Sequence, residues 1–129
     1  MRKKVFGVKL GRNKKSRLAL FRSLVAAMIL NGKIETTKTK AKAVQTDIEK
    51  LMGLVVKNNL SSRRIALARL GNDKEITAKL FGFSKLGAKR KFGFTRIVKL
   101  ARRKGDGAEM ARLEFVDTLE KDKKDKDKK

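Results

Sequence analysis

The sequence contains no cysteine and no histidine among its 129 residues. Without cysteine the chain cannot form a disulfide framework, carry a thiolate nucleophile or hold a zinc ribbon. Without histidine it lacks the usual general base and the imidazole ligand of many metal sites. Most familiar enzyme chemistries are therefore excluded, and we predict a non-enzymatic protein with no cofactor, no bound metal and no small-molecule substrate.

Long apolar runs are also missing. The longest, Leu24 to Leu30, has seven residues, whereas a helix needs about 18–20 to cross a bilayer. A basic start followed by an apolar stretch imitates a signal peptide, but Arg22 and Ser23 interrupt that stretch and Asn31-Gly32 is a poor cleavage site. The sequence predicts a mature soluble start, no transmembrane segment and no membrane partner.

Acidic residues are few: 13 Asp and Glu stand against 36 Lys and Arg, so the formal net charge at pH 7 is +23. The bases form two blocks, because residues 1–42 hold thirteen of them with one acid and residues 84–105 hold nine with none. Solubility alone needs a net charge of only about 2–8 in a small domain. We therefore predict a folded body that presents two basic surfaces to one large anion, a nucleic acid.

The hydrophobic spacing predicts an α/β (α+β) fold of about four helices packed on a small mixed sheet of about three short strands. Three segments are expected: a basic extended arm over 1–15, a single α/β domain over 16–116, and a disordered Lys/Asp-rich tail over 117–129. Helices are predicted over 16–30, over 38–57 with the apolar stripe Ala41, Val44, Ile48, Leu51, Met52 and Val55, over about 61–70, and after Asp73.

Cap residues mark the ends of these helices. Ser16 is the expected N-cap of the first, Thr37 or Thr39 of the second, and Ser61 or Ser62 of the third, while Asn31-Gly32 ends the first helix. Strands are predicted over 34–37, 94–100 and 110–116. Residues 82–93 are interpreted as a basic loop, and residues 101–109 as a long basic hairpin loop that can reach into a nucleic-acid groove.

Neither the acidic residues nor the glycines form a recognised site. Asp106, Glu109, Glu114 and Asp117 gather near the last strand, but they form no recognised metal-ligand set and are expected to counterbalance neighbouring arginines. No Gly-rich phosphate-binding motif is present. All seven aromatics are Phe. Core positions are expected for Phe21, Phe81 and Phe115, whereas Phe6, Phe92 and Phe94 stay open, since a Phe in a basic loop can stack on an unpaired base.

The candidate nucleic-acid contacts fall into three groups of basic side chains. Those of the arm are Arg2, Lys3, Lys4, Lys9, Arg12, Lys14, Lys15 and Arg17. Those of the predicted helices are Arg22, Lys38, Lys40 and Lys42, although a helix N-terminus disfavours cations unless a phosphate also lies there. Those near the strand pair are Arg96, Lys99, Arg102, Arg103 and Lys104. From this layout, deletion of residues 1–15 is expected to leave the fold intact and to weaken RNA association.

Three function classes compete for such a chain. An RNA-binding scaffold fits best. Composition alone allows a DNA-compacting architectural protein almost equally well, but such proteins commonly wedge apolar residues, often Pro, into the minor groove, and this chain has no Pro and no obvious paired arm. A cationic membrane-surface protein needs a helix with bases on one face and bulky apolar residues on the other. The predicted first helix, with only Arg17 and Arg22 as bases, fits that poorly.

Several motifs resemble, in order and spacing, the bacterial large-subunit ribosomal protein number seventeen family. They extend from Met1 to about Val116 and include Lys9-Leu10-Gly11-Arg12, Ile34-Glu35-Thr36-Thr37, Arg63-Arg64, Thr95-Arg96-Ile97 and Gly105-Asp106. The chain departs from the family pattern at Lys3 and Ser16 (usually His), Gln45-Thr46 (Arg-Pro), Phe94 (Tyr), and Arg102 and Glu109 (Pro).

The resemblance implies a compact domain with helices packed on a small sheet. It implies a structural role in translation without catalysis: binding to 23S-class ribosomal RNA, near the nascent-chain exit region, next to neighbouring large-subunit ribosomal proteins, in cytoplasmic ribosomes. It also adds Arg63 and Arg64 to the candidate RNA-binding residues.

Overall fold

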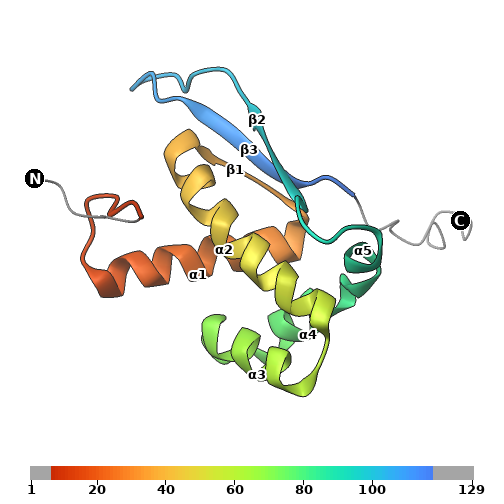
Figure 1. Cartoon of the computed structure of the whole chain (residues 1–129). Helices are drawn as coiled ribbons and strands as arrows, with labels where there is room; N and C mark the ends of the chain where they lie inside the picture. Colours follow the sequence, from red (N-terminus) through yellow and green to blue (C-terminus); the bar gives the residue numbers. More distant parts are fainter. Residues whose placement is uncertain (1–6, 118–129) are drawn as a thin grey trace, which may run out of the picture.

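The computed structural model describes residues 7–117, so the predictions that fall on Arg2, Lys3, Lys4 and Phe6, and on the tail from Thr118 onward, lie outside it. Within this range the chain forms five helices and a three-stranded sheet (Figure 1). Their bounds are α1 Lys14–Asn31, β1 Lys33–Thr37, α2 Lys38–Lys57, α3 Leu60–Arg69, α4 Lys74–Gly82, α5 Ser84–Lys89, β2 Thr95–Lys99 and β3 Met110–Phe115. The predicted α+β fold class is confirmed.

The helix starts are capped by residues other than the predicted serines. Asn13 caps α1, because its side-chain oxygen accepts a hydrogen bond from the Ser16 backbone N–H at 2.9 Å. Asn59 caps α3 in the same way, accepting from the Ser62 N–H at 2.7 Å. Ser16 and Ser62 lie inside the first turn of their helices, so each supplies the N–H that the cap satisfies. The helix α1 therefore begins at Lys14, two residues earlier than predicted.

Other helix ends follow the sequence signals. Thr37 occupies the N-cap position of α2 without a side-chain hydrogen bond. Asp73 caps α4 through the Ile76 N–H at 3.1 Å. Gly32 ends α1 at φ +77°, a left-handed conformation that costs glycine little, and Asn58 ends α2 at φ +45°.

The predicted loop over residues 82–93 is wrong in part, because it contains the helix α5. Its glycines argue against a helix locally, but tertiary packing outweighs that preference. Leu86 of α5 is buried in the common core. A Cβ added at Gly87 would lie 3.0 Å from Val56 Cγ2, so a larger residue here would require Val56 to shift where α5 packs on α2.

The sheet has the order β1-β3-β2, and both pairings are antiparallel, so the predicted mixed sheet is corrected to a purely antiparallel one. Leu113 lies between Ile34 and Ile97 across the three strands. The predicted alternation in β3 is confirmed: Ala111, Leu113 and Phe115 are buried, while Arg112 and Glu114 point to the other face. The inner face of the sheet is thus apolar and the outer face charged.

The helix α2 is the centre of the domain, between the sheet and the remaining helices (Figure 1). All six residues of its predicted apolar stripe are buried. The core that they join also contains Val25, Met28 and Ile29 of α1, Leu80 and Phe81 of α4, and Phe83, whose ring centroid is 5.0 Å from that of Phe115. A fully buried side chain of this size contributes about 1.5–3 kcal/mol. A polar tie adds to this core, because the Glu49 carboxylate on α2 accepts hydrogen bonds from the N–H and hydroxyl of Thr95 at 2.9 and 2.8 Å.

Candidate nucleic-acid interface

One cluster of basic residues forms where the start of α2, the end of β2 and the start of β3 converge. The Lys38 ammonium lies 3.3 Å from the Glu109 carboxylate, and the Arg102 guanidinium lies 3.8 Å from its other oxygen. The backbone N–H of Lys38 donates to the Glu109 carbonyl at 2.9 Å. Lys99 lines the same shallow pocket. Three predicted contacts from two distant parts of the sequence, Lys38 in one and Lys99 and Arg102 in the other, are therefore brought together around one carboxylate.

This convergence cluster consists of Lys38, Lys99, Arg102 and Glu109. Its three cations act on the carboxylate of Glu109. The pKa of Glu109 is lowered, first by the hydrogen bond from Lys38 and then by the positive charge of Lys38, with smaller effects from Arg102 and Lys99. Glu109 stays ionised at neutral pH and orders the cations, but it neutralises only one of them. The cluster keeps a net positive charge next to solvent.

The hairpin loop beyond this cluster is folded by its own side chains. Arg103 donates two hydrogen bonds to the Asp106 carboxylate, at 3.1 and 2.6 Å, and the Ala108 N–H donates to the same carboxylate at 3.1 Å. The Arg103 hydrogen bond is the main reason that the pKa of Asp106 falls to about 2. Arg103 is thus engaged within the loop, while Lys104 between these two residues is exposed.

A second basic group lies at the start of α1. Lys9, Arg12, Lys14 and Lys15 are exposed there. The segment before the helix is folded back, since the Arg12 guanidinium donates to the Leu10 carbonyl at 2.9 Å and the Arg17 guanidinium donates to the Arg12 carbonyl at 3.0 Å. The first turn of α1 holds no acid to offset its cations. In Figure 1 this segment and the hairpin loop extend to the same side of the view.

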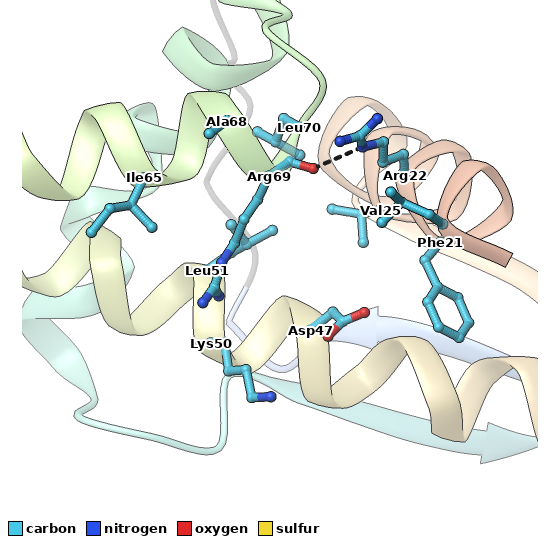
Figure 2. A pocket seen from close by; sticks show the side chains of 11 residues that line it. Phe21, Arg22, Val25, Asp47, Lys50, Leu51, Ile65, Ala68, Arg69 and Leu70 are labelled. Atoms are coloured by element: carbon cyan, nitrogen blue, oxygen red, sulfur yellow. Dashed lines mark hydrogen bonds between the residues drawn. The ribbon is translucent and has the colours of Figure 1, made fainter. Parts of the chain in front are cut away.

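Three other predicted contacts make hydrogen bonds or ion pairs within the protein. The Arg22 Nε–H donates to the Arg69 carbonyl at 3.2 Å, which joins α1 to the end of α3 above a mostly apolar groove of about 560 Å³ (Figure 2). Arg63 donates to the Asn58 side chain at 3.1 Å, and its guanidinium lies 5.1 Å from the Phe81 ring centroid. Arg96 pairs with Glu114 at 2.6 Å on the outer face of the sheet. The structure gives each of these arginines a role in the fold.

The remaining predicted contacts have no carboxylate partner within the described part of the chain. Lys42 and Arg64 are exposed, and Lys40 is half-buried. Lys40 and Lys42 lie early in α2, close in sequence to the convergence cluster, while Arg64 lies on α3, away from the other groups. The structure therefore gathers the basic residues of the α1 start and of the hairpin region into two groups and leaves Arg64 apart.

The acidic residues near β3 pair as predicted. Asp106 binds Arg103, Glu109 binds Lys38, and Asp117 binds Arg90 at 2.5 Å. Glu114 pairs with Arg96 and, at 3.1 Å, with Arg112, and the Arg96 hydrogen bond is the first cause of its lowered pKa. The outer face of the sheet is consequently close to neutral, whereas the two basic groups are positively charged.

The structure distinguishes the two Phe residues near the turn between α5 and β2 whose positions the sequence leaves open. Phe92 in this turn is 81 % exposed, whereas Phe94 is 3 % exposed and belongs to the core. The core positions predicted for Phe81 and Phe115 are confirmed, and Phe21 is half-buried against the core. The sequence signal for this turn is a Phe among basic residues, and the structure adds that the ring of Phe92 is exposed while that of Phe94 is buried.

None of the helices within residues 7–117 combines the length and the apolar character that crossing a membrane requires.

Comparison with known proteins identifies the family. The family model described as Ribosomal protein L17 matches residues 20–116. The large ribosomal subunit protein bL17 of Chloroflexus aurantiacus is 44% identical over 117 residues, which cover 90% of this chain and all of that protein. The bL17 protein of Persephonella marina is 44% identical over 124 residues, 95% of this chain and all of that protein, and the bL17 protein of Natranaerobius thermophilus is 46% identical over 112 residues, 84% and 96% of the two chains. The resemblance seen in the motifs is confirmed, and this chain belongs to the ribosomal protein L17 family.

Proposed function

We propose that this protein is a structural component of the large ribosomal subunit, in the cytoplasm, that binds 23S-class ribosomal RNA through its two basic groups. Membership of a non-enzymatic family of large-subunit ribosomal proteins supports this role. The net charge of +23 supports a polyanionic partner, because a compact chain of this charge repels itself unless an anion neutralises it.

The convergence cluster is the observation that carries the RNA-binding proposal. Lys38 of α2, Lys99 of β2 and Arg102 of the hairpin loop meet around a single acid, and Lys99 and Arg102 are exposed. Glu109 neutralises only one of these three cations, so an RNA phosphate can neutralise the positive charge that remains. Each phosphate contact made by a Lys or Arg releases condensed counterions from the RNA, and about 6–10 such contacts give strongly salt-dependent binding.

The proposed contacts fall into two sets, direct RNA contacts and residues with a supporting role. The α1 group, the convergence cluster and the basic residues near it offer direct contacts, which we assign to Lys9, Arg12, Lys14, Lys15, Lys38, Lys40, Lys42, Lys99, Arg102 and Lys104. Arg2, Lys3 and Lys4, which precede the described residues, are added from the predicted N-terminal arm. Arg64 is an exposed candidate on α3. Arg17, Arg22, Arg63, Arg96 and Arg103 are assigned a supporting role because their guanidinium groups already bond to the protein. Arg12 and Lys38 also make one side-chain hydrogen bond each, but they stay with the contacts because they lie among the other basic residues of the two groups.

Sedimentation of cell lysate on a density gradient tests the function. The protein is expected in the large-subunit fractions, to resist moderate salt and to leave them as the salt concentration rises further. Nuclease treatment of the fractions should release it. Sedimentation with the nucleoid instead would contradict the ribosomal proposal and favour the architectural DNA-binding alternative.

Removal of the basic segment before α1 tests the contact assignment. Because Asn13 caps α1, the deletion should stop at residue 12, which keeps the cap. The variant is expected to keep its unfolding temperature but to bind large-subunit RNA more weakly and with a smaller salt slope. Equal affinity across a salt series would show that this segment makes no contact.

The finer position, near the nascent-chain exit region and beside other large-subunit proteins, is part of the proposal and rests on the family resemblance. Chemical cross-linking of intact large subunits from the source cells, followed by mass spectrometry, tests it. Lysines of the two basic groups should cross-link to few proteins because RNA covers them. Cross-links to proteins remote from the exit region would contradict the proposed position.

A further inference from the structure

Phe92 is the most exposed of the large hydrophobic side chains in the described range, at 81 %. The nearby Phe94 differs from it in exposure. Phe94 is buried, and its carbonyl accepts a hydrogen bond from the Val116 N–H at 2.9 Å. The chain therefore buries one phenyl ring and leaves the other in solvent two residues earlier, although a fully buried Phe would stabilise the fold.

The turn that carries Phe92 is held in place by Arg90. The Arg90 side chain pairs with Asp117 at 2.5 Å and donates to the Gly93 carbonyl at 3.4 Å, and its backbone N–H donates to the Leu86 carbonyl at 3.2 Å. Gly93 follows at φ +70°, a conformation that a side chain would strain. The exposed ring is thus presented by a fixed turn.

The surroundings of the ring are positively charged. Lys91 directly precedes it and Lys89 ends α5, and both lysines are exposed. The one acid described at this turn, Asp117, already pairs with Arg90. A base-paired RNA helix presents phosphates and offers no free base face, whereas an unpaired nucleotide presents a flat base together with its phosphate. Aromatic side chains stack on such bases, and lysines contact the adjoining backbone.

We propose that Phe92 is a stacking site for an unpaired nucleobase of the ribosomal RNA, with Lys89 and Lys91 on the flanking phosphates. The inference rests on the proposed function, since it names the part of the RNA that this turn recognises. It adds a third RNA-contacting surface to the two basic groups and assigns it a single-stranded ligand.

Binding of the full-length protein to large-subunit ribosomal RNA, measured across a salt series, tests the proposal. Phe92→Ala and Phe92→Leu should weaken binding by about 5- to 150-fold, the range expected for one base–aromatic stack. Because the ring is uncharged, the salt slope should not change. Phe92→Trp should restore the affinity. Lys91→Ala is the matched electrostatic control and should reduce the salt slope by about one contact.

The outcomes separate this inference from the proposed function. If Phe92→Ala and wild-type protein bind the RNA equally, or if Phe92→Leu binds as well as wild type, stacking is wrong while RNA binding stands. If the Phe92→Ala protein binds RNA normally but fails to enter large subunits, the ring contacts a protein and the proposal is overturned. If the wild-type protein does not bind the RNA, the proposed function itself fails. Leu60→Ala, which truncates another exposed side chain, should leave RNA affinity unchanged.

Discussion

At the scale of single residues, internal pairing decides which cations can meet RNA. Arg102 and Arg103 are neighbours in the hairpin loop, yet Arg103 makes two short hydrogen bonds to Asp106 while Arg102 lies 3.8 Å from Glu109. A bidentate pair has more to lose than a loose one when a phosphate competes. We therefore assign Arg102 to RNA and Arg103 to the shape of the loop.

Titration of Asp106 tests the assignment of Arg103. The pKa of Asp106 is expected at about 2, below the ordinary 3.8, because Arg103 and the Ala108 N–H bind the ionised carboxylate. A lowered folded-state pKa means that ordering of the loop is fully present above pH ~4 and is lost as the pH falls through the folded-state value. The carboxyl carbon signal, followed by NMR from pH 6 to pH 1.5, measures the midpoint.

Two variants sharpen this titration. Arg103→Ala should move the midpoint for Asp106 upward toward the ordinary value, whereas Arg102→Ala should leave it unchanged. A wild-type midpoint near 3.8 would mean that the pair is absent in solution.

Removing the Glu49 side chain should destabilise the fold through a polar interaction. It accepts from both the N–H and the hydroxyl of Thr95, which is buried. Glu49→Ala is expected to lower the free energy of unfolding by about 1–3 kcal/mol, because a buried donor loses its partner. Urea unfolding measures this. Glu35→Ala is the control, since Glu35 is exposed and 4.0 Å from Arg112, and such a surface pair contributes about 0–1 kcal/mol. Equal losses in the two variants would remove the special role of Glu49.

At the scale of helices and strands, periodicity predicted the elements whose burial is strong. The apolar stripe of α2 and the alternation of β3 were both predicted from the sequence, because each element buries one face against the core. The helix caps were assigned less well, since Asn13 and Asn59 compete with nearby serines that are equally good caps on composition. Only the backbone geometry decides which of them precedes the helix.

The helix α5 could not be predicted, because its stability comes from contacts across the fold. Its six residues include Gly87, and local propensity favours a loop. What the sequence also could not show is which bases pair internally: Arg96 and Glu114 are eighteen positions apart and meet through the register of β2 and β3. The candidate site was therefore predicted as a set of basic blocks, and the structure reduces it to particular side chains.

Two glycines test whether close approach to α2 sustains α5. Gly87→Val should lower the free energy of unfolding by about 1–3 kcal/mol, because even a Cβ at this position would lie 3.0 Å from Val56 Cγ2. Gly53→Ala in α2 is the matched control and should raise it by about 0.5–1 kcal/mol, since a Cβ there meets nothing within 4 Å and alanine favours the helix. Thermal unfolding of both variants measures the difference. A Gly87→Val protein as stable as wild type would mean that α5 packs loosely on α2.

At the scale of the whole molecule, the distribution of charge lowers the stability of the free protein. The first turns of α1, α2 and α3 contain no acid, although acids there would favour each helix, and Lys14, Lys15, Lys38 and Lys40 occupy two of those turns. Cations at helix starts oppose the helix dipole and add to the repulsion within a +23 chain. A protein selected for its own stability alone would not place them there, whereas one whose helix starts face RNA phosphates would.

This conflict between stability and binding predicts that one charge reversal should improve the free protein and harm its function. Lys15→Glu puts an acid in the first turn of α1, so the free protein should gain about 0.3–1 kcal/mol from the helix dipole as well as from reduced repulsion. Its affinity for large-subunit RNA should fall, because a proposed phosphate contact becomes a negative charge. Urea unfolding at low salt and RNA binding across a salt series measure the two effects.

Lys57→Glu separates the dipole from the net charge. It makes the same change in charge at the last turn of α2, where a cation favours the helix. Relief of repulsion is common to both variants, but the dipole now acts in the opposite direction, so Lys57→Glu should be less stable than Lys15→Glu by about 0.6–2 kcal/mol. Lys57 is also outside the proposed contacts, and at about 0.15 M salt its reversal should affect RNA affinity less. If both variants gained equal stability and lost equal affinity, net charge alone would account for the behaviour of the protein, and the positive helix starts would have no specific part in binding RNA.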